Sequence, residues 1–554
     1  MAAHNTEHEA EKEAARMWSF VIALGALVVT LLAGRWLEKR HIHWMPHSGV
    51  GVLVGALCAG VLRWESGFST THLDDDVLKD ERFSNDVFMT LLLPPIIFDA
   101  GFNIDAPSAM RNLGPSTFFA FIGTTFSTAV VGLLCYGAGQ FGLCYPLGLL
   151  PALTFGSLIS ATDPVSVLSV FQALGVQDDV FAIVFGESVL NDAVAIVLTR
   201  TLLAFNTAPT AATAELTLSG RIIRACIVFI IEFASSLLIG ALFGGSLALL
   251  LHKLGMRERS RAPSATDAAT ELPSDDLVLT VALCFAFPWA SYYTAEALEC
   301  SGIVTLLFCG MVMAQYAKPH MSPAASRVAS SAFKCAGFVA ETGVFIYLGE
   351  AVFSFPILAH TTWKLVVVAM LACALGRLHV PIGVWLTNAY RGGGADAPLP
   401  NAELRDDAPL AHLSSGVSMV IWWSGLRGGV AFALASAIFA HRDFDQHCGG
   451  LARDAVGASH YHGWSRHCSE GPRTKHSMTD GLAILQVTLL IATCSIFFLG
   501  GTIKRVSEAC GVVKGHRDGD ALVLVRPADR PLVKRPSRTR LLVPTAAVPT
   551  DEGL

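Results

Sequence analysis

Long apolar stretches separated by short polar segments make up most of the chain. Stretches of predominantly apolar residues run at 18–35, 48–62, 84–102, 115–139, 147–173, 180–204, 223–251, 277–296, 301–316, 329–355, 363–389, 414–440 and 479–501. A helix that crosses a bilayer needs roughly 20 such residues, and most of these stretches reach or approach that length. The pattern therefore predicts an all-α, polytopic membrane protein with about 13 transmembrane helices.

The polar segments divide the chain into three predicted parts. Residues 1–17 form a polar leader, residues 18–501 form the transmembrane domain, and residues 502–554 form a short tail that is rich in arginine and proline. The leader carries four glutamates against one lysine and one arginine. Since a signal peptide begins with a positively charged region, we expect the first apolar stretch to be retained. The tail is expected to be largely disordered.

Basic residues indicate how the helices are oriented. Arg35, Lys39 and Arg40 follow the first apolar stretch, and Lys504 and Arg505 follow the last. Loops on the cytosolic side carry an excess of lysine and arginine. The pattern therefore predicts a cytosolic C-terminus and an N-terminus on the opposite face. Arg200, Arg221, Arg224 and the basic loop 441–478 go against this orientation.

Composition narrows the class of partner. Hydrophobic residues make up 53% of the chain and charged residues 15%, with a mean hydropathy of +0.52, whereas soluble domains carry about 25% charged residues. Lipid is therefore the expected surrounding. No basic tract is interleaved with aromatic residues, so nucleic acid is not an expected partner. Most of the 13 cysteines lie in or beside apolar stretches without metal-ligand spacing, so neither a cofactor nor a resident metal is predicted.

Six charged residues nevertheless fall inside the apolar stretches: Asp163, Glu187, Asp192, Glu341, Arg377 and Arg427. Each costs at least about 2.5–3.5 kcal/mol near the bilayer centre on insertion scales. One interpretation is that they pair and hold helices together. Acids outnumber arginines, however, so pairing by itself cannot account for all of them.

Two of the apolar stretches contain helix-breaking residues in the middle. Asp163 directly precedes Pro164, which disfavours helix at that position, and three glycines flank Arg427. Interrupted spans at matching places in two halves indicate the ion site of a transporter. We therefore predict two inverted six-helix repeats, spans 1–6 and 8–13. Their broken helices, spans 5 and 12, should cross at the midplane, with Arg427 compensating the converging helix N-termini.

The chemistry at this crossing suits a monovalent cation. Asp192, Asp163, Ser160, Thr162 and the carbonyl groups freed by the breaks supply oxygen ligands without a soft donor. A single carboxylate that binds either a proton or a cation is sufficient for exchange, because each face of the membrane loads whichever ion wins the competition there. No metal beyond the transported cation is predicted.

Six motifs occur in the order found in a known family. They are LLLPPIIFDAGFNID (91–105), ATDPVSVLSVF (161–171), FGESVLNDAVAIVL (185–198), SGIVTLLFCGMVMAQY (301–316), ETGVFIYLGEAVF (341–353) and SGLRGGVAFAL (424–434). From residue 84 to about 505 the chain resembles the sodium/proton exchangers of the monovalent cation/proton antiporter-1 family. The resemblance implies antiport of Na⁺ or K⁺ for H⁺ in pH and cation homeostasis, and no enzymatic activity.

The resemblance also implies roles for individual residues. Asp192 would be the exchanging carboxylate, with Asn191 and Asp163 beside it. Core helices would be joined by a Glu187–Arg377 ion pair and by a Glu341–Arg427 ion pair. Leu93, Pro94 and Pro95 belong to the third-span motif that the family links to amiloride-type inhibitors.

Further family features are implied for the assembly. An asparagine before the aspartate, here Asn191, accompanies electroneutral one-for-one exchange in the wider superfamily. The resemblance implies a homodimer whose core bundles move in an elevator-like manner against a dimer scaffold. The residues of motif 301–316 resemble the organellar branch of the family more than the plasma-membrane branch, which favours an endosomal or Golgi-type membrane.

The long polar loop 441–478 has two interpretations. It holds Cys448, Cys468 and six histidines. If the loop faces the exterior or an organelle lumen, Cys448 and Cys468 could form a disulfide, and the histidines could sense pH. The simpler interpretation is a solvated, variable loop.

Other classes of function remain as hypotheses. An intramembrane aspartyl protease could use Asp163 and Asp192, but the Gly-x-Gly-Asp signature is absent and Pro164 and Asn191 would have no role. A cation channel or a non-transporting pH sensor on the same scaffold is the remaining alternative. Ion flux would separate a channel from an antiporter, because a channel generates a membrane potential.

Overall fold

The structure, a computed structural model, describes most of the predicted membrane domain. It covers residues 2–40, 45–65, 88–104, 111–163, 171, 178–206, 218–255, 275–354, 360–390, 413–440 and 480–512. The regular structure of these residues is helical throughout, without a strand. Cys448, Cys468 and the rest of loop 441–478 lie outside the described residues, so the predictions made for them stay predictions.

Seven helices in the described residues are long and apolar enough to cross a membrane: Leu113–Gln140, Val180–Ala204, Ile223–Leu254, Asp275–Ala297, Pro323–Val352, Thr362–Ala389 and Asp480–Ala509. Shorter apolar helices follow the remaining stretches, at Val21–Leu37, His47–Val61, Thr90–Phe102, Leu149–Ser160 and Gly429–Phe439. The all-α, multi-pass class is confirmed. The number of 13 spans stays a prediction.

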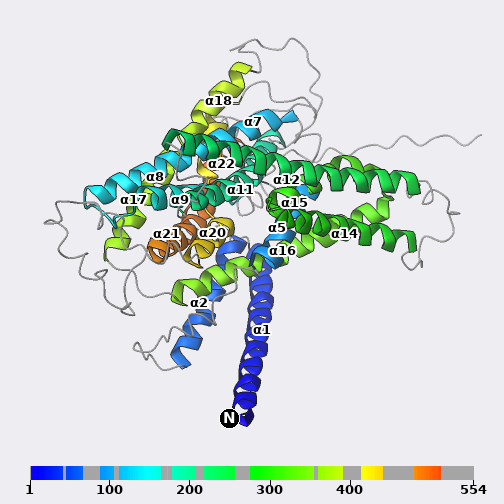
Figure 1. Ribbon diagram of the computed structural model, residues 1–554, viewed down its shortest axis with the longest axis horizontal. Helices are drawn as coiled ribbons and strands as arrows, with labels where there is room; N and C mark the ends of the chain where they lie inside the picture. The colour runs from blue at the N-terminus through cyan, green and yellow to red at the C-terminus, as the bar shows by residue number, and fades with distance from the viewer. Residues whose placement is uncertain are drawn as a thin grey trace, which may run out of the picture. The chain divides into compact units, whose positions relative to one another are not determined.

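By their contacts the helices fall into two groups. The first helix group comprises α1 (Ala2–Lys39), α2 (His47–Glu65), α5 (Leu93–Phe102), α12 (Leu218–Leu254), α14 (Asp275–Ala297), α15 (Gly302–Val312) and α16 (Pro323–Ser354). Here α16 packs on α2 and α5, and α15 packs on α5, α12 and α14 (Figure 1). Gly349 of α16 has no space for a Cβ atom against the backbone of Val52 in α2, which allows these two helices to approach closely.

The second helix group holds most of the predicted site. It comprises α7 (Leu113–Phe118), the π-helical turn η2 (Phe119–Gly123), α8 (Thr124–Gln140), α9 (Leu149–Ser160), α11 (Asp178–Asn206), α17 (His360–Gly376), α18 (His379–Tyr390), α19 (Ser415–Trp423), α20 (Gly429–Ala440), α21 (Asp480–Ser495) and α22 (Gly501–Ala509). Within it, α9 packs on α8 and α11, and α20 packs on α21. The last span continues through α22, past residue 501.

Both predicted helix breaks are present. Helix α9 ends at Ser160 and residues 161–163 are not helical, while residues 424–428 separate α19 from α20. The backbone N–H of Asp163 donates to the carbonyl of Leu426 at 2.9 Å, so the two interrupted segments cross in direct contact. A further short interruption, at Arg377 and Leu378, separates α17 from α18.

Candidate functional site

Helix α11 presents a row of buried polar side chains toward the crossing. Glu187, Ser188, Asn191 and Asp192 are each at most 5% exposed. Residues four apart share a helix face, so Glu187 lies beside Asn191, and Ser188 lies beside Asp192. Burial of four polar side chains on two successive turns of a largely apolar helix requires partners from neighbouring elements.

The amide of Asn191 holds the interrupted segment that follows α9. Its Nδ2 donates to Thr162 Oγ1 at 2.6 Å, and its Oδ1 accepts from the Thr162 backbone N–H at 3.3 Å. The Thr162 hydroxyl also lies 3.1 Å from Ser188 Oγ. Both ends of the Asn191 amide are therefore used to hold Thr162, which brings two predicted site residues into direct contact.

Asp163 lies where the two breaks cross. A Cβ atom at Gly428 would collide with the Asp163 side chain, so a glycine at this position is what allows the carboxylate to lie against the segment that leads into α20. The N-terminal end of a helix carries positive partial charge, and α20 begins at Gly429. The local sequence thus places a carboxylate next to a helix start.

Arg427 binds the C-terminal end of the other broken helix. Its Nη1 donates to the carbonyl oxygens of Ser160 at 2.7 Å and Ala161 at 3.3 Å. Its own backbone is held by Ser495, whose hydroxyl accepts from Arg427 N and lies 3.0 Å from Arg427 O. The last carbonyls of a helix lack intrahelical donors and carry negative partial charge, so the guanidinium stabilises the end of α9.

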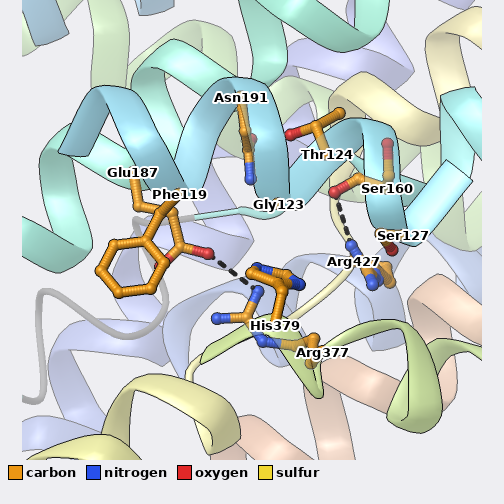
Figure 2. Close-up of a pocket in the computed structure, with 10 residues that line it drawn as sticks. All are labelled: Phe119, Gly123, Thr124, Ser127, Ser160, Glu187, Asn191, Arg377, His379 and Arg427. Carbon is orange, nitrogen blue, oxygen red and sulfur yellow. Dashed lines mark hydrogen bonds and ion pairs between the residues drawn. The ribbon is translucent and has the colours of Figure 1, made fainter. Parts of the chain in front are cut away.

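Arg377 has the corresponding role for α19. Its Nη2 donates to the Ile421 carbonyl at 2.6 Å, two residues before α19 ends, and its Nη1 lies 3.1 Å from Glu187 Oε1. Side-chain exposure is 7% for the arginine and 3% for the glutamate. The predicted Glu187–Arg377 ion pair is confirmed (Figure 2).

The predicted Glu341–Arg427 ion pair is wrong. No ion pair joins these residues in the part of the chain that the structure describes, and Arg427 instead binds the carbonyls of α9. The charged groups that interact electrostatically with Glu341, on α16, are two acids, Asp163 and Asp99. The expectation that Arg427 serves helix N-termini is also wrong, because it binds a C-terminal end, where a cation is favourable and an N-terminus would repel it.

Asp192 forms no ion pair among the described residues. It is 5% exposed, and its Oδ1 has no hydrogen-bond partner among the described residues. The charged groups that act on it electrostatically are Asp163 and Arg427. Because both arginines are engaged elsewhere, the Asp192 carboxylate is available to bind a proton or a cation.

A polar cavity lies beside this cluster. It is lined by Phe119, Gly123, Thr124, Ser127, Ser160, Glu187, Asn191, Arg377, His379 and Arg427. Figure 2 shows these residues together with the Glu187–Arg377 and Ser160–Arg427 contacts. Five of the ten were predicted from the sequence. Asp163, Thr162 and Asp192 are not among the lining residues.

Sequence reasoning missed His379 and the hydroxyls of Thr124 and Ser127. His379 is 6% exposed, and its Nδ1 bonds the Gly376 carbonyl at 2.8 Å. A carbonyl only accepts, so Nδ1 carries the proton. Its Nε2 has no partner among the described residues. A histidine inside an apolar stretch was the available signal, because a titratable side chain within a span indicates a functional position.

The remaining predicted residues lie elsewhere. Leu93, Pro94 and Pro95 begin α5 in the first helix group, where prolines fit because the first helical N–H groups need no intrahelical partner. Within the described ranges, no group of three or more His, Cys, Asp or Glu side chains could hold a metal ion.

Comparison with known proteins connects this geometry to a family. A family model described as "Sodium/hydrogen exchanger, transmembrane" matches residues 24–509. Sodium/hydrogen exchanger 5 of Arabidopsis thaliana is 32% identical over 78% of this chain and 74% of its own length. Sodium/hydrogen exchanger 8 of Homo sapiens is 29% identical over 77% of this chain and 66% of its own length. The endosomal/prevacuolar sodium/hydrogen exchanger of Saccharomyces cerevisiae is 29% identical over 76% of this chain and 62% of its own length.

A solved structure supports the fold independently. The sodium proton antiporter MjNhaP1 of Methanocaldococcus jannaschii aligns with a TM-score of 0.56, over 90% of this chain and 98% of that protein. Identity is 16%, so the likeness concerns the fold.

Proposed function

Because the chain belongs to the sodium/hydrogen exchanger family, we propose that it is a secondary antiporter that exchanges Na⁺ or K⁺ for H⁺ through Asp192. The family consists of transporters, which supports cation/proton antiport across a membrane over an enzymatic activity. The observation that carries the assignment to Asp192 is its buried carboxylate, which has no ion pair in the described residues although two arginines lie in the same cluster.

The mechanism follows from competition for one carboxylate. Hard cations favour oxygen ligands, and Asp192 together with Asp163 can offer carboxylate oxygens at the crossing. A proton bound to Asp192 removes the charge that holds the cation, so the two ions exclude each other. Movement of the loaded site between the two faces of the membrane then couples the transport of one ion to transport of the other in the opposite direction.

Asn191 supports one-for-one exchange in this proposal. Its amide is occupied by two hydrogen bonds to Thr162, so it positions the interrupted segment and contributes no titratable charge. One exchangeable carboxylate then carries either one proton or one monovalent cation, which makes the cycle electroneutral. Asp163, the second acid at the crossing, completes the cation's oxygen ligands.

The assembly and location are part of the proposal. We expect a homodimer in which the second helix group moves relative to the first. We also expect an endosomal or Golgi-type membrane, with the C-terminus in the cytosol. The similarity to an endosomal/prevacuolar exchanger of yeast favours an organellar location.

The test is proton flux in proteoliposomes that contain the purified protein, with Na⁺, K⁺ and Li⁺ gradients compared. We expect flux that depends on an opposing cation gradient and that generates no membrane potential. Asp192→Asn should abolish it while the protein still folds. A potential-generating current would indicate the channel alternative, and normal flux in Asp192→Asn would overturn the assignment.

Asn191→Asp is the companion variant. An aspartate retains the acceptor for the Thr162 N–H and can also accept from the Thr162 hydroxyl, so we expect transport to persist. The added charge should make exchange sensitive to an imposed membrane potential. A folded but inert variant would contradict this role for Asn191.

A further inference from the structure

Arg200 joins the two helix groups through a cluster of three charges. It lies on α11, the helix that carries Asp192, and its Nη1 is 3.9 Å from Glu232 Oε1 on α12. Its Nη2 is 3.5 Å from Glu296 Oε1 on α14. Arg200 lies eight positions after Asp192, which is about 12 Å along a helix. The cluster therefore connects the candidate ion-binding helix to two helices of the first group.

The acidic side of this cluster belongs to a firmly joined unit. Ser236 Oγ accepts from the Ser301 backbone N–H at 2.9 Å, and Thr305 Oγ1 donates to the Ser236 carbonyl at 3.1 Å, which ties α12 to α15. Glu296 Oε1 accepts from Gly302 N at 3.0 Å and so holds the end of α14 against the start of α15. Glu232 on α12 and Glu296 on α14 thus belong to helices that are both hydrogen-bonded to the start of α15.

An aromatic contact accompanies the charges at the same boundary. Phe233, the residue after Glu232, packs edge-on against Phe121 of η2 at 4.9 Å between ring centroids. It also packs against Phe308 of α15 at 5.8 Å. Helix α11 itself packs chiefly on α7, η2 and α9 of the second group, and it meets the first group at α12. The Arg200 cluster therefore lies at a boundary between the groups.

We infer that Arg200 is a positioning residue for exchange: its ion pairs with Glu232 and Glu296 favour one placement of α11 against α12 and α14, and they break when α11 moves. The inference rests on the proposed antiport function and adds a residue to it that no motif singled out. The contact is an electrostatic interaction between the two helix groups, and neither Glu232 nor Glu296 is proposed to bind the transported ion.

The strength of these pairs suits a contact that opens in each cycle. Side-chain exposure is 39% for Arg200, 15% for Glu232 and 36% for Glu296. Partly exposed ion pairs without hydrogen-bond geometry are weak, unlike the Glu187–Arg377 pair inside the second group. When Arg200 leaves, the repulsion between the like charges of Glu232 and Glu296 is no longer offset by a positive charge. This repulsion favours the return of the arginine.

A purely structural role makes a different prediction from a positioning role. An apparent dissociation constant equals the intrinsic dissociation constant divided by the fraction of molecules in the competent state. Loss of the Arg200 pairs should therefore raise the apparent cation KM on the membrane face that the favoured placement serves and lower it on the opposite face. Loss of structural integrity alone would reduce the maximal rate and leave both KM values unchanged.

The experiment measures cation-dependent proton flux from each face, in oriented proteoliposomes of the full chain. The variants are Arg200→Gln, Glu232→Gln, their double variant and Arg200→Lys. Arg327→Gln is the matched control, because Arg327 is exposed and, among the residues that the structure describes, its side chain bonds only the Pro323 carbonyl of its own helix. We expect Arg200→Gln to shift the apparent KM on one face by up to about fivefold, with a smaller, opposite shift on the other face.

The other variants keep the inference falsifiable if Arg200→Gln folds poorly. Glu232→Gln should shift the two KM values in the same directions as Arg200→Gln but less, since the Glu296 pair remains. The double variant should shift no further than Arg200→Gln, and Arg200→Lys should stay within about twofold of the wild type. Unchanged KM values on both faces, or shifts in the same direction, would overturn the inference while leaving the proposed function intact. Absent flux in the wild type would overturn both.

Discussion

Replacing Arg377 with methionine tests whether the buried ion pair holds the second helix group together. The change keeps an apolar stem but leaves Glu187, at 3% side-chain exposure, without its cation. It also removes one of the two side-chain donors to the Ile421 carbonyl, the other being Ser424 Oγ. Breaking a buried pair by removing one partner costs about 3–5 kcal/mol. We expect Arg377→Met to lose that much stability.

The double variant Glu187→Met/Arg377→Met separates the pair from the remaining hydrogen bond. Replacing both partners of a buried pair by apolar groups is often close to neutral, so the uncompensated charge disappears. What remains is the loss of the hydrogen bond from the Arg377 guanidinium to the Ile421 carbonyl, which still accepts from Ser424 Oγ at 2.7 Å. A hydrogen bond to a charged group contributes about 1.5–3 kcal/mol. The double variant should therefore be more stable than Arg377→Met by roughly 2 kcal/mol, the difference between these two ranges.

Unfolding of the purified variants in mixed micelles, titrated with a denaturing detergent, measures these differences. The exposed Arg327→Gln variant controls for loss of a positive charge. The reasoning would be refuted if Arg377→Met were as stable as this control, or if the double variant were less stable than Arg377→Met. In the second case the ion pair would contribute nothing beyond its separate side chains.

Two further predictions concern backbone positions. Gly428→Ala should cut exchange at least about tenfold, as small displacements at a reacting site do, because its methyl group would meet the Asp163 side chain. Gly245 has open space around it, so the control variant Gly245→Ala should leave flux unchanged. Equal flux in the two variants would contradict the crossing geometry. Glu299 has φ of 57°, a conformation that favours glycine, so Glu299→Gly should stabilise the protein by up to about 1 kcal/mol with unaltered flux. A lower thermal melting temperature for Glu299→Gly would show that its side chain contributes contacts worth more than the backbone strain.

The local features of the site were predictable because they depend on nearby residues. Asp163 before Pro164 and the glycines around Arg427 indicated both helix breaks, and the structure has them. The resemblance of the motifs to a known family supplied the Glu187–Arg377 pair. These predictions succeeded because a proline, a cluster of glycines or a charge in an apolar stretch constrains the backbone or requires a partner wherever the chain folds.

The predictions that failed depended on competition between partners in space. Arg427 was assigned to Glu341, but the freed carbonyls of Ser160 and Ala161 bind its guanidinium instead. A sequence shows which side chains are present, but it does not show which backbone carbonyl groups need a donor. His379 was overlooked for a related reason, since its neighbours in the cavity come from helices far away along the chain.

The sequence by itself determined that this is a helical membrane protein with two interrupted spans, buried charges and the motifs of a cation exchanger. It did so because burial in lipid limits which residues a span can hold. Only the tertiary structure decided which partner each charge takes: both arginines bind the ends of broken helices, Asn191 holds Thr162, and Asp192 is left without an ion pair in the described residues. That choice depends on distances between helices, which no local pattern records.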